Sequence, residues 1–300
     1  MSKQTRYYLG RVLKRGELSS ARVIEAMRSP VTIEYRGTRY SFIDFERFDI
    51  NGEQVGYVAK IAKYRQQGAV EVVHEAHHAS AEAAVVNLID ATSAFVYLPE
   101  VSGIAYRHIW NTFPREQFER VFKELVELKH NKFFVAVDIE PIADLRTFVS
   151  RLAKLDRMTH LAATVVPPNP LFGPCWKSLA EYLRKRNLEE ATINEQSAMG
   201  IESNISQIAT AVLDETDPAS MVELMEPLLD GVGDAALLMA ADGYGHARVE
   251  GTEGDRKVVI RTSENQKSFL IDSGSGSAVL YERSAEIFRL HTEERGLEHP

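Results

Sequence analysis

The chain has 300 residues, of which 44% are apolar and 26% are charged, and its net charge is −8 at pH 7. These values are normal for a globular protein, and a chain of this length can bury a core without disulfides or metals. Cys175 has no partner cysteine, so nothing indicates an oxidising compartment. No signal-peptide pattern and no apolar run of roughly 18 to 20 residues are present. We therefore expect a cytoplasmic protein without membrane contact.

Charge is distributed unevenly along the sequence. Residues 1–65 contain 13 Lys/Arg and 7 Asp/Glu, a net charge of +6, so the other 235 residues carry −14. Such an asymmetry can indicate a face that binds an anionic partner.

The first half of the chain predicts mainly β-structure. Strands are expected over residues 7–14, 54–64 and 95–98, with Gly68 ending the second, and a hairpin over 32–40 turns at Arg36-Gly37. Helices are expected over residues 18–27 and after Pro114, where Phe118, Val121, Phe122 and Leu125 follow helical spacing.

The second half alternates between the two periodicities. A strand over 133–139, a helix over 144–155 and a strand over 161–166 suit a βαβ unit or part of a ferredoxin-like fold. Helices follow over 175–190, more weakly over 194–213, and over 219–229, ended by a helix cap at Gly231. A hairpin over 243–262 and a Ser/Gly link over 273–277 complete the pattern.

The fold class is therefore α+β, with an antiparallel, aromatic-rich N-terminal sheet followed by a ferredoxin-like or βαβ second half. We expect a basic, aromatic β-rich domain over residues 1–130, an α/β domain over 131–272, and a link with a charged C-terminal segment over 273–300. One continuous domain is nearly as compatible with the pattern.

One candidate site is a zinc motif. His74-Glu75-Ala76-His77-His78 contains the H-E-x-x-H spacing. On a helix, His74 and His78 would share one face and hold zinc, while Glu75 would activate the metal-bound water. The alanine-rich stretch 75–90 is compatible with a helix, but residues 69–73 resemble a strand that continues into His74. A chance match, with no metal or other cofactor, is the competing interpretation.

The other candidate is the basic N-terminal sheet, where tyrosines alternate with cations. The candidate nucleic-acid-binding residues are Arg11, Lys14, Arg15, Arg36, Arg39, Lys60, Lys63 and Arg65. Cations neutralise phosphates, and exposed rings stack on unpaired bases. Against this, aromatic residues are common in any strand and cations protect sheet edges.

Three stretches together resemble an uncharacterised bacterial family of unknown function. They are Phe95-Val96-Tyr97-Leu98-Pro99 to Phe118, Thr164-Val165-Val166-Pro167-Pro168-Asn169-Pro170, and Gly243-Tyr244-Gly245 to Thr262-Ser263. The resemblance implies a setting on mobile elements or near phage-defence genes, and it carries no residue roles.

The leading hypothesis is a cytoplasmic binding or effector component in bacterial antiviral defence. It would contact nucleic acid or a partner protein, and could form a homo-oligomer. The alternative is a zinc-dependent hydrolase that uses His74, Glu75 and His78.

Overall fold

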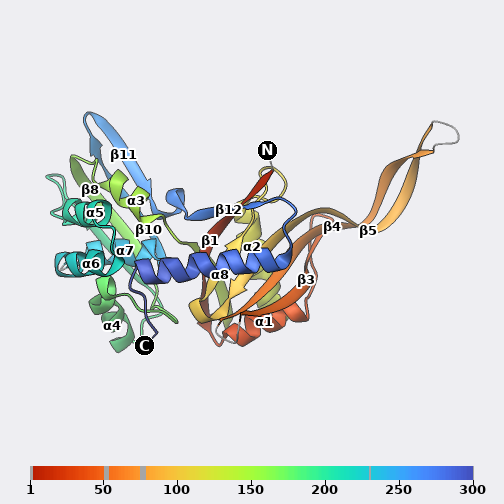
Figure 1. The fold of residues 1–300 in the computed structure, drawn as a ribbon, viewed down its shortest axis with the longest axis horizontal. Helices are drawn as coiled ribbons and strands as arrows, with labels where there is room; N and C mark the ends of the chain where they lie inside the picture. The colour runs from red at the N-terminus through yellow and green to blue at the C-terminus, as the bar shows by residue number, and fades with distance from the viewer. Residues whose placement is uncertain (1–2, 51–53, 75–78, 230, 300) are drawn as a thin grey trace. The chain divides into compact units, whose positions relative to one another are not determined.

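The computed structural model describes residues 3–50, 54–74, 79–229 and 231–299 (Figure 1). Internal contacts divide the chain into two compact units. Unit 1 comprises residues 1–13, 98–105 and 139–300, and unit 2 comprises residues 14–97 and 106–138. Both units are discontinuous in sequence. The domain boundaries expected near residues 130 and 272 stay a prediction.

Unit 2 contains an antiparallel sheet with the strand order β5-β4-β3-β2 and two helices. The elements are α1 (Ser20–Arg28), β2 (Ile33–Tyr35), β3 (Thr38–Ile50), β4 (Gln54–His74), β5 (Ala79–Leu98) and α2 (Arg115–Lys129). Arg36 and Gly37 have φ angles of 50° and 75° between β2 and β3, which suits the two-residue hairpin turn expected there.

An aromatic cluster forms the core of unit 2. Phe42 and Phe95 from the sheet pack with Phe118 and Phe122 from α2, and none is more than 1% exposed. The ring centroids of Phe42 and Phe95 lie 5.7 Å apart, and those of Phe95 and Phe122 lie 5.6 Å apart. Tilted and edge-on contacts at such distances are favourable beyond the area they bury. The expected antiparallel, aromatic-rich N-terminal sheet is thus confirmed.

Unit 1 contains a strand group in the order β12-β1-β6 and a four-stranded sheet in the order β11-β10-β8-β9. The strands are β1 (Gln4–Gly16), β6 (Gly103–Tyr106), β8 (Arg157–Val165), β9 (Ala191–Gln196), β10 (Gly245–Glu253), β11 (Arg256–Arg261) and β12 (Ser268–Asp272), while β7 (Val135–Pro141) begins in unit 2 and ends in unit 1. The helices are α3 (Leu145–Leu152), α4 (Lys177–Lys185), α5 (Ile205–Asp214), α6 (Pro218–Met225), α7 (Val232–Ala241) and α8 (Ser277–Glu294).

Helix α7 is the central helix of the four-stranded sheet, because it contacts β8, β9 and β10. Its Ala, Leu and Met side chains are almost all buried, and a helix that is apolar all round belongs in a core. Gly231 is the N-cap of α7, so the prediction that it caps the end of the preceding helix is wrong. Helix α6 already ends at Met225.

Three further expectations need correction. Gly68 does not end its strand, because β4 continues to His74 in register with β5. Residues 79–90 belong to β5 rather than to a helix. Residues 191–196 form β9, and helix α5 begins only at Ile205. In each case pairing with a neighbouring strand outweighs local propensity.

The strand, helix and strand expected over residues 133–166 are present as β7, α3 and β8. However, β7 pairs with β1, whereas β8 pairs with β9 and β10, both antiparallel. A βαβ unit requires two parallel strands in one sheet, so these elements do not form one. The α+β class itself is confirmed. Across the described ranges, no helix is both long and apolar enough to cross a membrane.

Candidate functional site

Arg11, one of the predicted nucleic-acid-binding cations, is fully buried in unit 1. Its Nε donates to the main-chain oxygen of Asp242 (3.1 Å) and its Nη1 to that of Val101 (2.6 Å). Its guanidinium also lies 4.7 Å from the ring centroid of Tyr244. Arg11 therefore stabilises the core of unit 1 and cannot reach a phosphate.

The other predicted cations lie at or near the surface of unit 2, mostly beside an acceptor. The nitrogen–oxygen distances are 3.9 Å for Arg15–Asp138, 3.0 Å for Arg39–Glu34, 2.8 Å for Lys60–Asp44, 3.4 Å for Lys63 to the Thr112 carbonyl, and 2.8 Å for Arg65–Asp90. Lys14 is half-buried. Arg36 is exposed at the β2–β3 turn and has no carboxylate partner among the described residues. Five of these seven cations thus lie beside an acceptor, so fewer of the predicted binding residues are unpaired than the sequence suggests.

Most of the aromatic rings that could stack on bases are not exposed. Tyr7, Tyr40 and Phe42 are buried. Tyr35 is exposed beside the β2–β3 turn, and the guanidinium of Arg120 lies 4.8 Å from its ring centroid. Tyr8, Tyr57 and Tyr64 are half-buried, so some of these rings build cores and Tyr35 alone among them is exposed.

The zinc motif falls largely outside the described residues. His74 is the last residue of β4 and stands opposite Ala79 in the strand register, while Glu75 and His78 are not described. Within the described part of the chain, no three His, Cys, Asp or Glu side chains come together to hold a metal. The zinc hydrolase stays a prediction.

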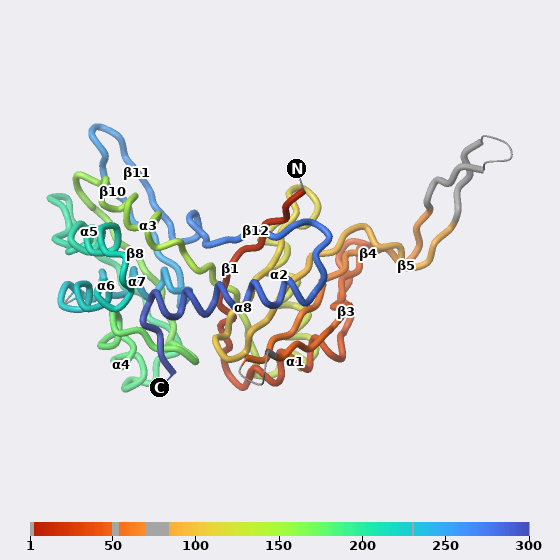
Figure 2. Tube along the Cα trace, viewed as in Figure 1, coloured from red at the N-terminus to blue at the C-terminus, as the bar shows by residue number. Residues whose placement is uncertain are grey.

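The most distinctive feature of unit 2 is the part of the β4–β5 hairpin that leaves the sheet. Strand β3 pairs with β4 only as far as Tyr64, and beyond that residue β4 pairs with β5 alone in the described structure. We call residues 65–74 and 79–90 the arm. Figure 1 shows it projecting from the other strands of its unit, and Figure 2 shows the same for the part of the arm nearest the sheet. At about 3.3 Å per residue, a ribbon of this length extends about 30 Å.

The base of the arm is fixed by specific contacts. Arg65 donates two hydrogen bonds from Nε and one from Nη2 to the Asp90 carboxylate, at 3.1, 3.1 and 2.8 Å. Leu88 crosses the ribbon over Gly68, where a Cβ would lie 2.7 Å from its Cδ2. Gly68 is therefore needed for close packing across the two strands, rather than to end one of them.

Apolar side chains are exposed along the described part of the arm. Val86 is 74% exposed and Ile89 is 50% exposed. The segment 65–90 contains one Arg and no Lys, against four Asp or Glu residues, so it is acidic. Both edges of a two-stranded ribbon present unpaired main-chain N–H and C=O groups. These properties suit contact with protein better than contact with phosphate.

Unit 1 contains a buried charge cluster formed by Arg11, Trp176, Asp242, Tyr244 and Arg295. Arg295 donates to both Asp242 oxygens, at 2.8 and 3.2 Å, and Trp176 Nε1 donates to Asp242 Oδ2 at 2.8 Å. Burial alone would lower the pKa of Arg295, but the Asp242 carboxylate outweighs it and raises that pKa. Arg295 is therefore a buried cation whose charge the Asp242 carboxylate stabilises.

Cys175 lies beside this cluster and is buried. Burial raises the pKa of its thiol to about 11. Because the thiolate is the reactive form, Cys175 is inert at neutral pH. It therefore behaves as a small buried apolar side chain.

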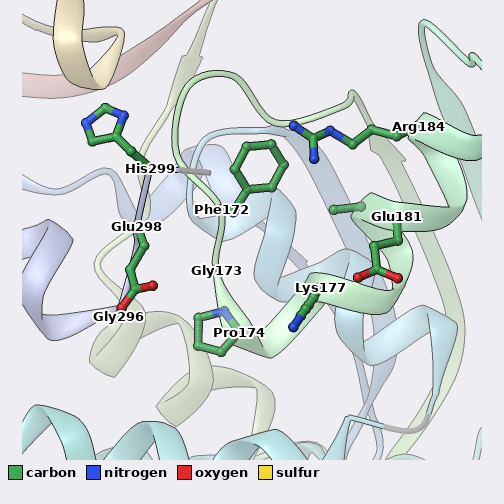
Figure 3. Close-up of a pocket in the computed structure, with 10 residues that line it drawn as sticks. Phe172, Gly173, Pro174, Lys177, Glu181, Arg184, Gly296, Glu298 and His299 are labelled. Atoms are coloured by element: carbon green, nitrogen blue, oxygen red, sulfur yellow. The ribbon is translucent and has the colours of Figure 1, made fainter.

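A cavity of about 350 Å³ opens in unit 1 between α4 and the last residues of the chain (Figure 3). Phe172 and Glu298 pair through two main-chain hydrogen bonds of 2.7 and 2.8 Å at one wall. At the opposite wall, the Arg184 guanidinium lies 3.9 Å from the Phe172 ring centroid. Lys177 and Glu181 also line the cavity, so it carries charges of both signs and does not select a ligand by charge.

The fold and these surfaces define an α+β protein with a projecting hairpin. Residues 21–213 match the family described as a domain of unknown function, DUF4747. The match covers more than half of the chain, so the protein belongs to this family. No curated protein matches the chain.

Proposed function

We propose that this protein is a binding component whose arm contacts a partner protein. The observation that supports it most directly is the arm itself, which leaves its sheet with exposed Val86 and Ile89. Isolated two-stranded hairpins are marginally stable in water, and adding a strand to an exposed edge is a common way to bind a partner. A cytoplasmic setting in bacterial antiviral defence, which the sequence resemblance implies, belongs to the same proposal.

A protein partner fits the described charges better than nucleic acid does. Phosphate binding requires several unpaired cations on one surface, whereas Arg39, Lys60 and Arg65 each contact a carboxylate. A second copy of the chain is one partner that the proposal allows.

Site-specific photocrosslinking in cells tests this proposal. A photoreactive amino acid at position 86 or 89 should form protein adducts that resist nuclease treatment. Leu128, which is 38% exposed on α2 of the same unit, is the matched control position and should form none. Adducts to nucleic acid alone, or equal adducts from positions 86 and 128, would overturn the proposal.

A shortened arm provides the second measurement. Replacing residues 67–86 with Asn-Gly joins Gln66 to Asn87 through a favoured two-residue hairpin turn. The partner identified by crosslinking, once purified, should bind the intact chain and not the shortened one. An unchanged melting temperature would show that the body remains folded.

A further inference from the structure

Strand β9 forms one edge of the four-stranded sheet in unit 1 and lies beside an apolar groove. It pairs with β8 over Ala191–Gln196, and no other described strand pairs with it. Alternate residues of such a strand direct their N–H and C=O groups away from the sheet. This edge is therefore available for a further strand.

Side-chain contacts hold β9 in position against β8. The hydroxyl oxygens of Thr192 and Thr164 lie 3.2 Å apart, and Asn194 Oδ1 lies 2.7 Å from His160 Nε2. Glu195, the residue after Asn194, lies against Gly233 of α7 and is therefore on the face of the sheet that α7 covers. Because side chains alternate between the two faces of a strand, Thr192 and Asn194 make their contacts on the opposite face. The edge is thus preformed, which reduces the entropy lost on binding.

The groove runs between β9, α4 and the start of α7, and its volume is about 520 Å³. Its lining is mainly apolar, and includes Leu179 and Tyr182 from α4, Ile193 from β9, and Val232 from α7. Tyr182 is 51% exposed and Val232 is 54% exposed. Consecutive residues 191–193 all border the groove, so the main chain of β9 itself forms its wall.

One positive charge lies beside a residue that lines the groove. Arg186 caps the end of α4, and its guanidinium lies 5.7 Å from the ring centroid of Tyr182, which lines the groove. Among the described residues, no carboxylate pairs with Arg186. A ligand that fills the groove can therefore gain an ion pair at this end.

We propose that this groove binds an extended segment of a partner protein that pairs with β9 as an added strand. Its alternate apolar side chains enter the groove, because side chains alternate between the faces of a strand, and an acidic residue reaches Arg186. Combining main-chain pairing with side-chain pockets is an established mode of peptide recognition. This site is in unit 1 and is independent of the arm.

The test uses the full chain and a fluorescent ten-residue peptide in which Leu and Val alternate with Thr and which ends in two Glu residues. Fluorescence anisotropy should show saturable binding, and hydrogen exchange should slow within residues 191–196. A peptide of the same sequence with N-methylated main-chain amides cannot donate to β9 and should not bind.

Two substitutions locate the site. Val232→Glu places a charge in the groove and should abolish binding, while Arg186→Glu should weaken it roughly tenfold and make it less salt-dependent. Val279→Glu, at a position 47% exposed on α8, is the matched control and should bind normally. Crosslinking from the arm should be unchanged in both groove variants, which separates this proposal from the proposed function.

Three results would overturn the inference. One is a lack of binding by the peptide, and another is equal binding by the Val232→Glu variant. The third is concentration-dependent dimerisation that Val232→Glu abolishes, because a second copy of the chain would then occupy the groove.

Discussion

Two arginine–aspartate pairs in this protein have similar geometry and opposite surroundings. Arg65 and Asp90 join the strands at the base of the arm, with side chains 51% and 27% exposed. Arg295 and Asp242 form the buried pair of unit 1, with side chains 1% and 2% exposed. The shortest nitrogen–oxygen distance is 2.8 Å in both.

The difference in exposure decides what each pair contributes. Water and salt screen an exposed pair, and its long side chains lose entropy when they are held together, so its net contribution is small. A buried pair has lost its hydration, so removing one partner leaves a charge that nothing compensates. Charge counts from sequence cannot separate these cases.

Substituting Asp242 should give the largest effect. Asp242→Asn keeps the shape of the side chain but leaves the buried Arg295 without its carboxylate partner. We expect the free energy of unfolding to fall by about 3–5 kcal/mol, measured by urea denaturation. The control Asp90→Asn should lose less than about 1 kcal/mol. Equal losses in the two variants would contradict the comparison.

His291 provides the next largest effect, and it depends on pH. Burial, followed by the charges of Lys267, Arg11 and Arg295, lowers the pKa of His291 well below its usual value. A depressed histidine pKa means that the unfolded chain binds a proton more readily than the folded protein does. The stability associated with His291 is therefore complete above about pH 6.5 and is lost as the pH falls toward the depressed pKa.

Urea unfolding at several pH values between 7 and 5 measures this dependence. The contribution of His291 should be small near pH 7, and below about pH 6.5 its loss should approach about 1.4 kcal/mol per pH unit. His291→Gln removes the titrating group, so its stability should fall less steeply than that of the original protein. Identical slopes would show that His291 accepts a proton in the folded state.

Local patterns predict much of this fold. The helical spacing of Phe118, Val121, Phe122 and Leu125 identifies α2, and Arg36-Gly37 identifies the β2–β3 turn. The helix and the turn both depend on residues that are close in sequence, so a local pattern is enough to predict them. The path of β4 beyond Gly68 depends instead on pairing with β5, and a residue-by-residue propensity cannot show it.

The candidate sites were harder to predict than the fold. The sequence places Arg11 among the surface cations, because charged side chains are seldom fully buried without a partner. Its partners, Asp242 and Tyr244, lie more than 200 residues away, and sequence gives no sign of such contacts. The edge position of β9 depends on strand order, which also involves distant residues. The zinc motif at His74 stays a prediction, which metal analysis of purified protein can test.

The smallest predicted effect is the interaction energy of the exposed pair, measured by a double-mutant cycle. Arg65→Gln, Asp90→Asn and the double variant should give a coupling of about 0.2–1 kcal/mol, because both side chains remain partly solvated. High salt should reduce this coupling, while the effect of Asp242→Asn should change little. A coupling as large as the loss in Asp242→Asn would mean that the base of the arm is shielded from water. In that case a partner protein or a second copy of the chain would have to bury this ion pair in solution. Repeating the cycle in the chain with the shortened arm would show whether that binding requires the arm.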